Sequence, residues 1–129
     1  MAVQTRNLLG VGGHLTEIVS WPNWNSSLDG VAANFRTTTT VLTAVAKLDT
    51  NKIIVVWEDS GVSDYGFACV GTISGGVITW GTAVMFSNSA TITNNAVAAL
   101  STTQAIVCFR DTSDSSKGKA VILNVSGTV

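Results

Sequence analysis

The chain contains one sequence pattern twice. Residues 44–77 and 96–129 align without a gap at an offset of 52 residues, and 14 of the 34 aligned pairs are identical. A duplicated pattern of this length predicts one supersecondary unit per repeat, and such a unit cannot bury its apolar face alone. How those apolar faces become covered is therefore the main question that the sequence poses.

Each repeat predicts short strands separated by turns that contain Gly, Asp or Asn. In the first repeat, the expected strands are residues 41–48, 52–58, 65–73 and 77–86. The second repeat predicts the same first three strands and reaches Val129 where its fourth strand should begin. No segment shows helical spacing with caps. Four short antiparallel strands per repeat are typical of a β-propeller blade, so we expect an all-β fold with two four-stranded blades per chain.

Two blades cannot close a propeller, which typically has about 4–8 blades. Cyclic assembly of several chains would close it, and we expect a six-bladed ring built as a homotrimer; rings of two or four chains remain alternatives. The passage Gly12–Thr16 (GGHLT) resembles Gly75–Thr79 (GGVIT). We therefore expect residues 14–21 to form a strand that completes the second repeat of a neighbouring chain. The expected organisation is an arm, donated strand and extended loop over residues 1–40, a first blade over 41–95 and a second blade over 96–129.

The composition fits a chain that hides much of its surface in contacts. Hydrophobic residues make up 46% and charged residues 12%, and the net charge is −1. Few charges remain to keep such a surface soluble, and the near-zero charge gives no electrostatic basis for binding nucleic acid. No apolar run is long enough to span a membrane. The first residues lack the apolar core of a signal peptide, so we expect synthesis in the cytoplasm without Sec export. Cys69 and Cys108 lie in apolar runs, and we expect buried free thiols, with a disulfide as the alternative.

Residues suited to catalysis or metal binding are few. The single histidine, His14, lacks the partners of a Ser-His-Asp site, and two separated cysteines do not make a metal centre. The segments 59–64 and 111–114 could offer oxygens to calcium, but they lack the spacing of a calcium loop and fit hairpin turns better. Adjacent carboxylates at Glu58 and Asp59 point opposite ways on a strand, and we expect a solvated strand end there. We expect no enzymatic activity and no cofactor.

An aromatic platform for a sugar is conceivable, but it does not recur in both repeats. Its candidates are Trp21, Trp24, Trp57 and Trp80. In the second repeat Trp57-Glu58 becomes Phe109-Arg110, and Tyr65 becomes Lys117. Packing between blades is the preferred role for Trp57 and Trp80.

The repeat resembles known tandem repeats. The segments KLDTNK, VVWED and YGFACVGTISG of the first repeat are similar to repeats in phage and bacterial surface proteins. The arrangement of two blades per chain resembles small lectins that build six-bladed propellers from three chains. The resemblance covers residues 44–129 and implies a fold, with carbohydrate binding as one possible function.

The segments outside the repeat point to a partner. The arm, residues 1–13, and the lengthened loop, residues 23–36, are not needed to build blades. We expect a phage capsid decoration or cement protein on the virion surface, a trimer that binds the major capsid protein; the alternative is a lectin that binds a glycan. Exposed apolar and polar groups in these segments are the expected contacts. The candidate partner-binding residues are Gln4, Arg6, Asn7, Leu8, Leu9, Trp24, Asn25, Leu28, Asp29, Phe35 and Arg36.

Overall fold

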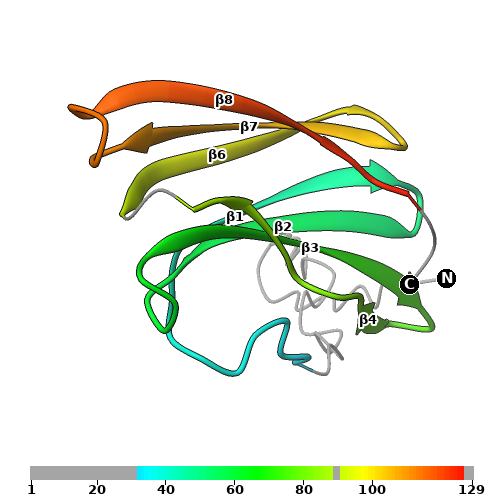
Figure 1. The fold of residues 1–129 in the computed structure, drawn as a ribbon. Helices are drawn as coiled ribbons and strands as arrows, with labels where there is room; N and C mark the ends of the chain where they lie inside the picture. Colours follow the sequence, from blue (N-terminus) through cyan, green and yellow to red (C-terminus); the bar gives the residue numbers. More distant parts are fainter. Residues whose placement is uncertain (1–31, 89–90, 127–129) are drawn as a thin grey trace, which may run out of the picture. The chain divides into compact units, whose positions relative to one another are not determined.

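The computed structural model describes residues 32–88 and 91–126 (Figure 1). Of these residues 67% lie in strands and none in a helix, which confirms the all-β prediction. Residues 31–129 form one compact unit, which contains both sheets. Residues 1–30 form the other unit and lie outside the described residues, as does the strand expected at 14–21.

The first sheet contains five antiparallel strands. They are β1 (Thr40–Asp49), β2 (Lys52–Asp59), β3 (Tyr65–Ser74), β4 (Val77–Trp80) and β5 (Val84–Ser87). The order is β1-β2-β3-β4, and β5 also pairs with β3. The expected single fourth strand over 77–86 is therefore two short strands, which pair with opposite halves of β3. The ladder is interrupted after Trp80, where the amide of Gly81 donates to the carbonyl of Val70 at 2.9 Å.

The second sheet repeats the first three strands. They are β6 (Ile92–Ser101), β7 (Gln104–Asp111) and β8 (Lys117–Asn124), paired antiparallel in that order. Equivalence at an offset of 52 residues extends to unusual backbone angles. Leu42 and Asn94 have φ of 51° and 53°, and each lies within a register shift of its inner strand. Non-glycine residues rarely adopt such angles, so the same β-bulge has been kept in both repeats.

The two sheets stack on one another and share one apolar core (Figure 1). Successive side chains of a strand point to opposite faces, so alternate residues of the first sheet face the second. Buried there are Leu48, Ile54, Val56 and Ala68, with Ala44, Ala46 and Val70 packed beside them. The second sheet contributes Ile92, Ala105, Val107 and Phe109, with Val97, Val121, Leu123 and Val125 beside them. The faces that meet are not equivalent in the two repeats. The first sheet uses the face that carries Ile54 and Val56, whereas the second uses the face that carries Val107 and Phe109.

Candidate interaction surfaces

The first sheet has a second apolar face, which we call the far face. Its apolar residues are Val45, Ile53, Val55, Trp57, Phe67 and Cys69, and the exposed Lys47 lies beside Ile53 on the same face. The connector before β1 covers part of it. The ring of Phe35 lies 5.0 Å from that of Trp57 and 5.5 Å from that of Trp80, and Trp80 Nε1 donates to the carbonyl of Ala33 at 3.0 Å. Val45 stays 62% exposed, so the cover is incomplete.

Asp59, at the end of β2, is fully buried and anchors this connector through charge. Arg36 Nε lies 2.6 Å from one carboxylate oxygen of Asp59. The other oxygen accepts hydrogen bonds from Thr38 Oγ1 and from the amide of Gly61, both at 3.0 Å. Arg36 also lies over the ring of Phe67, with 5.7 Å between its guanidinium carbon and the ring centroid. The residues before β1 are therefore held on the first sheet by stacking and by an ion pair.

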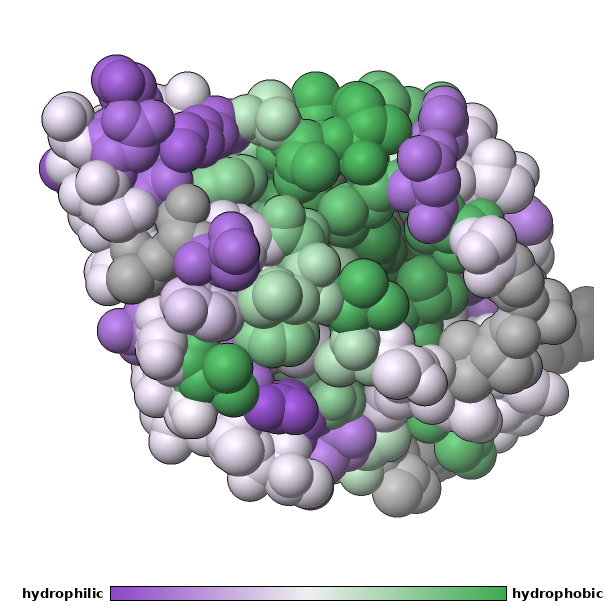
Figure 2. Space-filling model, viewed as in Figure 1, coloured by the Kyte–Doolittle hydropathy of each residue, from purple (hydrophilic) through white to green (hydrophobic). Residues whose placement is uncertain are grey.

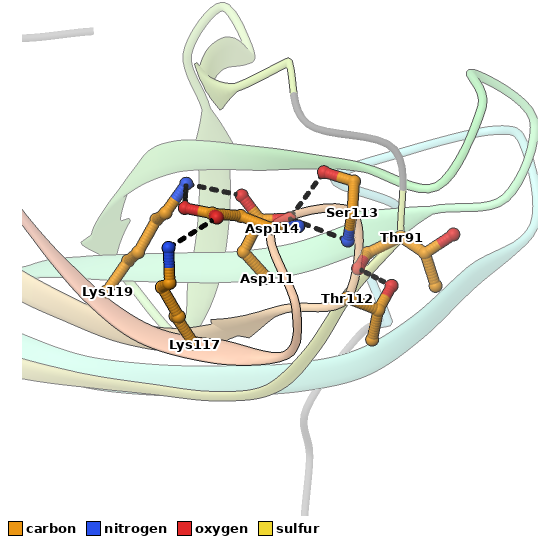
Figure 3. Close-up of polar contacts among 7 residues, drawn as sticks. All are labelled: Thr91, Asp111, Thr112, Ser113, Asp114, Lys117 and Lys119. Atoms are coloured by element: carbon orange, nitrogen blue, oxygen red, sulfur yellow. Dashed lines mark hydrogen bonds and ion pairs between the residues drawn. The ribbon is translucent and has the colours of Figure 1, made fainter.

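The second repeat builds the same buried carboxylate with a different cation (Figure 3). Asp111, equivalent to Asp59, accepts hydrogen bonds from the amide and hydroxyl of Ser113 at 2.9 and 2.6 Å and from the amide of Asp114 at 3.2 Å. Lys119 Nζ lies 2.7 Å from its second oxygen. The residue equivalent to Lys119 in the first repeat is Phe67, which carries no charge. In that repeat the cation beside the buried aspartate is Arg36 of the connector. Residues 59–64 and 111–114 are thus turns, as preferred over calcium loops, and the carboxylate at the start of each is paired with a cation, Arg36 for Asp59 and Lys119 for Asp111.

The charges around this turn shift one another's pKa in opposite directions. Hydrogen bonds from Lys117 and then Lys119 lower the pKa of Asp114. Hydrogen bonds to Asp111 and then Asp114 raise the pKa of Lys119. The stabilising contribution of Asp114 is therefore present above its ordinary pKa and is lost as the pH falls through the lowered value. That of Lys119 is lost as the pH rises through its raised pKa.

Glu58 and Asp59 do not form a solvated strand end, so that expectation was wrong: both carboxylates are buried. Glu58 points to the face opposite Asp59, and no described cation pairs with it. One of its oxygens has no hydrogen-bond partner within the described part of the chain. Burial chiefly, and then the charge and a hydrogen bond of Asp64, raise the pKa of Glu58. The folded protein thus binds a proton here more tightly than the unfolded chain does.

We expect Glu58→Gln to stabilise the fold at neutral pH, because an uncharged amide replaces a buried carboxylate without a counter-ion. In the parent protein the free energy of unfolding should fall as the pH rises from 4.5, the ordinary pKa of glutamate, through the raised value. The gain of the variant should shrink on acidification. Denaturant titrations at several pH values measure this, with Asp49→Asn on the exposed end of β1 as the control. A gain that does not depend on pH would contradict the assignment.

The second sheet exposes an apolar face, which we call the outer face. Directly paired residues share a face, so the register places Ala98, Ile106 and Ile122 together, and likewise Ala96, Cys108 and Ala120. Leu100 continues this series on β6. Leu100 is 54% and Ile122 44% exposed, and all the others except Ile106 are exposed as well. No described side chain covers this face.

The equivalent face of the first sheet shows how such a face is covered. The seven residues equivalent to the outer face all lie in the core between the sheets; they are Ala44, Ala46, Leu48, Ile54, Val56, Ala68 and Val70. Five of the seven pairs are identical and the other two, Val56/Cys108 and Val70/Ile122, stay apolar. Glycines show the same contrast. A Cβ on Gly66 would lie 2.6 Å from the ring of Phe86, whereas one on the equivalent Gly118 would meet nothing within 4 Å. The outer face therefore has the composition of a buried surface without the neighbour that buries it.

The candidate residues from the sequence divide into two groups. Phe35 and Arg36 lie in the described connector and pack on the first sheet as described above. The other nine lie outside the described residues: Gln4, Arg6, Asn7, Leu8, Leu9, Trp24, Asn25, Leu28 and Asp29. Trp57, a candidate sugar platform, is fully buried, and Trp80 is partly buried. Both cysteines are free; Cys69 is buried as expected, but Cys108 is exposed because its face has no cover.

Sequence reasoning missed the outer face. The signal was present, because residues equivalent to apolar core positions of the first repeat stay apolar in the second. What could not be read from the repeat was which of its two faces the other repeat covers.

Within the described ranges, no group of three or more His, Cys, Asp or Glu side chains could hold a metal ion. In the same part of the chain, no helix is long and apolar enough to cross a membrane. Comparisons with protein-family models, curated proteins and solved structures found no significant match.

Proposed function

We propose that the chain is a non-enzymatic structural protein that assembles head to tail into a closed ring and decorates the surface of a phage capsid. In the ring, the outer face of one chain covers the far face of the next. Three chains would supply six sheets, within the range of about 4–8 blades of closed propellers.

The uncovered outer face is the observation that supports assembly. Within the chain, the face of the first sheet with the same residues is covered by the second sheet. On the far face of a further copy, Val45 is 62% exposed and can repeat the part of this contact that Val97 makes. Val55 and Trp57, the equivalents of Val107 and Phe109, are already buried beside Phe35 and Trp80. Contacts between unlike faces form rings when the rotation closes. Burying exposed Leu and Ile side chains supplies the free energy.

The decoration role rests on the segment before β1. Phe35 and Arg36 hold the described end of this segment on the first sheet. The nine remaining candidate residues are the proposed contacts with the major capsid protein. The lectin alternative gains no support from the described residues, because Trp57 is inaccessible to a sugar ring.

Leu100→Lys is expected to abolish the trimer, because it places a charge within the proposed apolar contact of the outer face. Multi-angle light scattering should show a trimer for the parent and a folded monomer for the variant, with the circular dichroism spectrum unchanged. Thr102→Lys, in the exposed turn after β6, is the control and should remain trimeric. A parent protein that is a stable, folded monomer at micromolar concentration would end the proposal of a ring.

Truncation after Gly10 tests the decoration role separately. The trimer should survive and co-sedimentation with expanded capsids should fall, because Gln4, Arg6, Asn7, Leu8 and Leu9 are lost. A glycan array with the parent protein tests the lectin alternative. If the truncated protein still binds capsids with the affinity of the parent, the arm does not supply the contacts with the capsid.

A further inference from the structure

A cleft with both apolar and polar lining opens between the two sheets along the edge of β8. It has a volume of about 900 Å³ and lies between the end of β8, residues 122–126, and residues 68–70 and 80–84 of the first sheet. Ile54, Val70, Val84 and Leu123 supply much of its apolar lining. Figure 2 shows apolar residues gathered in the hollow between the sheets.

One wall of this cleft is the edge of β8 that pairs with no other described strand. In the first sheet, the edge of β3 pairs with β4 at residues 71–74 and with β5 at residues 66–68. In the second sheet, among the described residues, β8 pairs only with β7. Backbone N–H and C=O groups of an open edge are a template for a further strand, and addition of a strand to such an edge is a common mode of peptide recognition.

We propose that this cleft is a strand-acceptor site and that residues 14–21 of a second copy of the chain occupy it. The inference rests on the proposed ring and adds its second contact. The first repeat shows the arrangement: Gly75-Gly76 turns the chain into β4, β4 and β5 pair with β3, and the chain then enters β6 of the stacked sheet. The passage Gly12–Thr16 stands in the same order before β1. By analogy, a strand that directly precedes β1 in the sequence should pair within the sheet that is stacked on the far face. In the proposed ring, that sheet is the second sheet of the neighbouring chain.

The first sheet also predicts the register. Thr72 pairs with Thr79 and Ile73 with Ile78, so the equivalent pairs are Asn124 with Thr16 and Val125 with Leu15. One difference between the repeats fits this. Gly71 leaves room for Trp80, whose ring would lie 2.6 Å from an added Cβ. The equivalent of Gly71 is Leu123, whose side chain packs against the core and lines the cleft. The strand opposite it needs no aromatic residue and has Glu17 in the place of Trp80.

A cysteine pair in the full-length chain tests the site. In a Cys108→Ser background, Thr16→Cys is combined with Asn124→Cys, because directly opposite residues lie within the Cα separation of about 4.4–6.8 Å that a disulfide requires. Mild oxidation should link chains to one another, and a non-reducing denaturing gel should show linked dimers and trimers in place of the single chain. The matched control combines Thr16→Cys with Ser115→Cys, an exposed position in the turn at the other end of β8, and should give no such ladder.

The outcomes separate this inference from the ring itself. Linked chains in the matched pair alone support the strand-acceptor site. A trimer by light scattering that forms no link overturns the site and leaves the ring in place, with a foreign strand as the remaining occupant of the cleft. A link within one chain, seen as a single-chain mass that has lost two hydrogens, overturns the assignment to a second copy. A folded monomer without a link overturns both proposals.

Discussion

Trp57→Ala should lower the free energy of unfolding by about 3–5 kcal/mol, the range for removing a large aromatic side chain from a core. Trp57 is fully buried, its ring stacks 6.0 Å from that of Phe67 and it supports Phe35 at 5.0 Å. Its loss would leave a cavity and free the connector from the far face. Denaturant titration followed by circular dichroism measures the change.

The second repeat supplies the control for this variant. Phe109 is the equivalent of Trp57, so Trp57→Phe places a residue that this fold already accepts. Trp57 Nε1 has no hydrogen-bond partner among the described residues, so no such bond is lost. The cost should stay below about 1.5 kcal/mol, as for other substitutions that keep most of the volume. A cost as large as that of Trp57→Ala would show that the indole itself is required.

Asp111→Ala should cost about 2–3 kcal/mol, because it removes an acceptor of several hydrogen bonds and the partner of a cation. The expected cost lies at or below the lower end of the range for broken buried ion pairs, since Lys119 is 38% exposed and water can replace its partner in part. The amides of Ser113 and Asp114 would also lose their acceptor. Thermal and denaturant unfolding measure the cost.

Two further variants locate the source of this effect. Asp111→Asn keeps an oxygen for the turn amides and loses the charge, so it should fall between Asp111→Ala and the parent. Asp114→Ala removes a half-exposed carboxylate of the same turn and should change stability little. If Asp114→Ala cost as much as Asp111→Ala, the buried position of Asp111 would not be the reason for its effect.

The sequence predicted the strands well because the duplication doubled each signal. Six of the expected strands match observed ones to within a few residues, and the turns at Asp59 and Asp111 are where the pattern placed them. The fourth strand was expected whole and is two strands, because pairing with both halves of β3 was not visible in an apolar run. The bulges at Leu42 and Asn94 were not predicted either, since neither residue is a glycine that would signal a positive φ.

The interaction surfaces were less predictable, because exposure depends on what lies across a face. Cys108 occupies a position whose equivalent, Val56, is fully buried, and it is exposed because no described segment covers the outer face. Arg36 was expected to contact a partner. It pairs with Asp59, because the first repeat has Phe67 at the position from which Lys119 pairs with Asp111 in the second. The sequence alone does not indicate that these two aspartates are buried and need a cation.

The position of Arg36 sets the limits of the smallest part of this chain that could be cut out and transplanted. The duplicated pattern begins at Ala44 and the first strand at Thr40. A fragment that starts at either residue would lack Arg36, which pairs with the buried Asp59, and Phe35, which packs on Trp57. The second repeat carries its cation within itself, at Lys119. The two repeats therefore differ as fragments for transfer into another protein. The first repeat needs the connector from residue 32 onward, whereas the second does not need it to pair its buried aspartate.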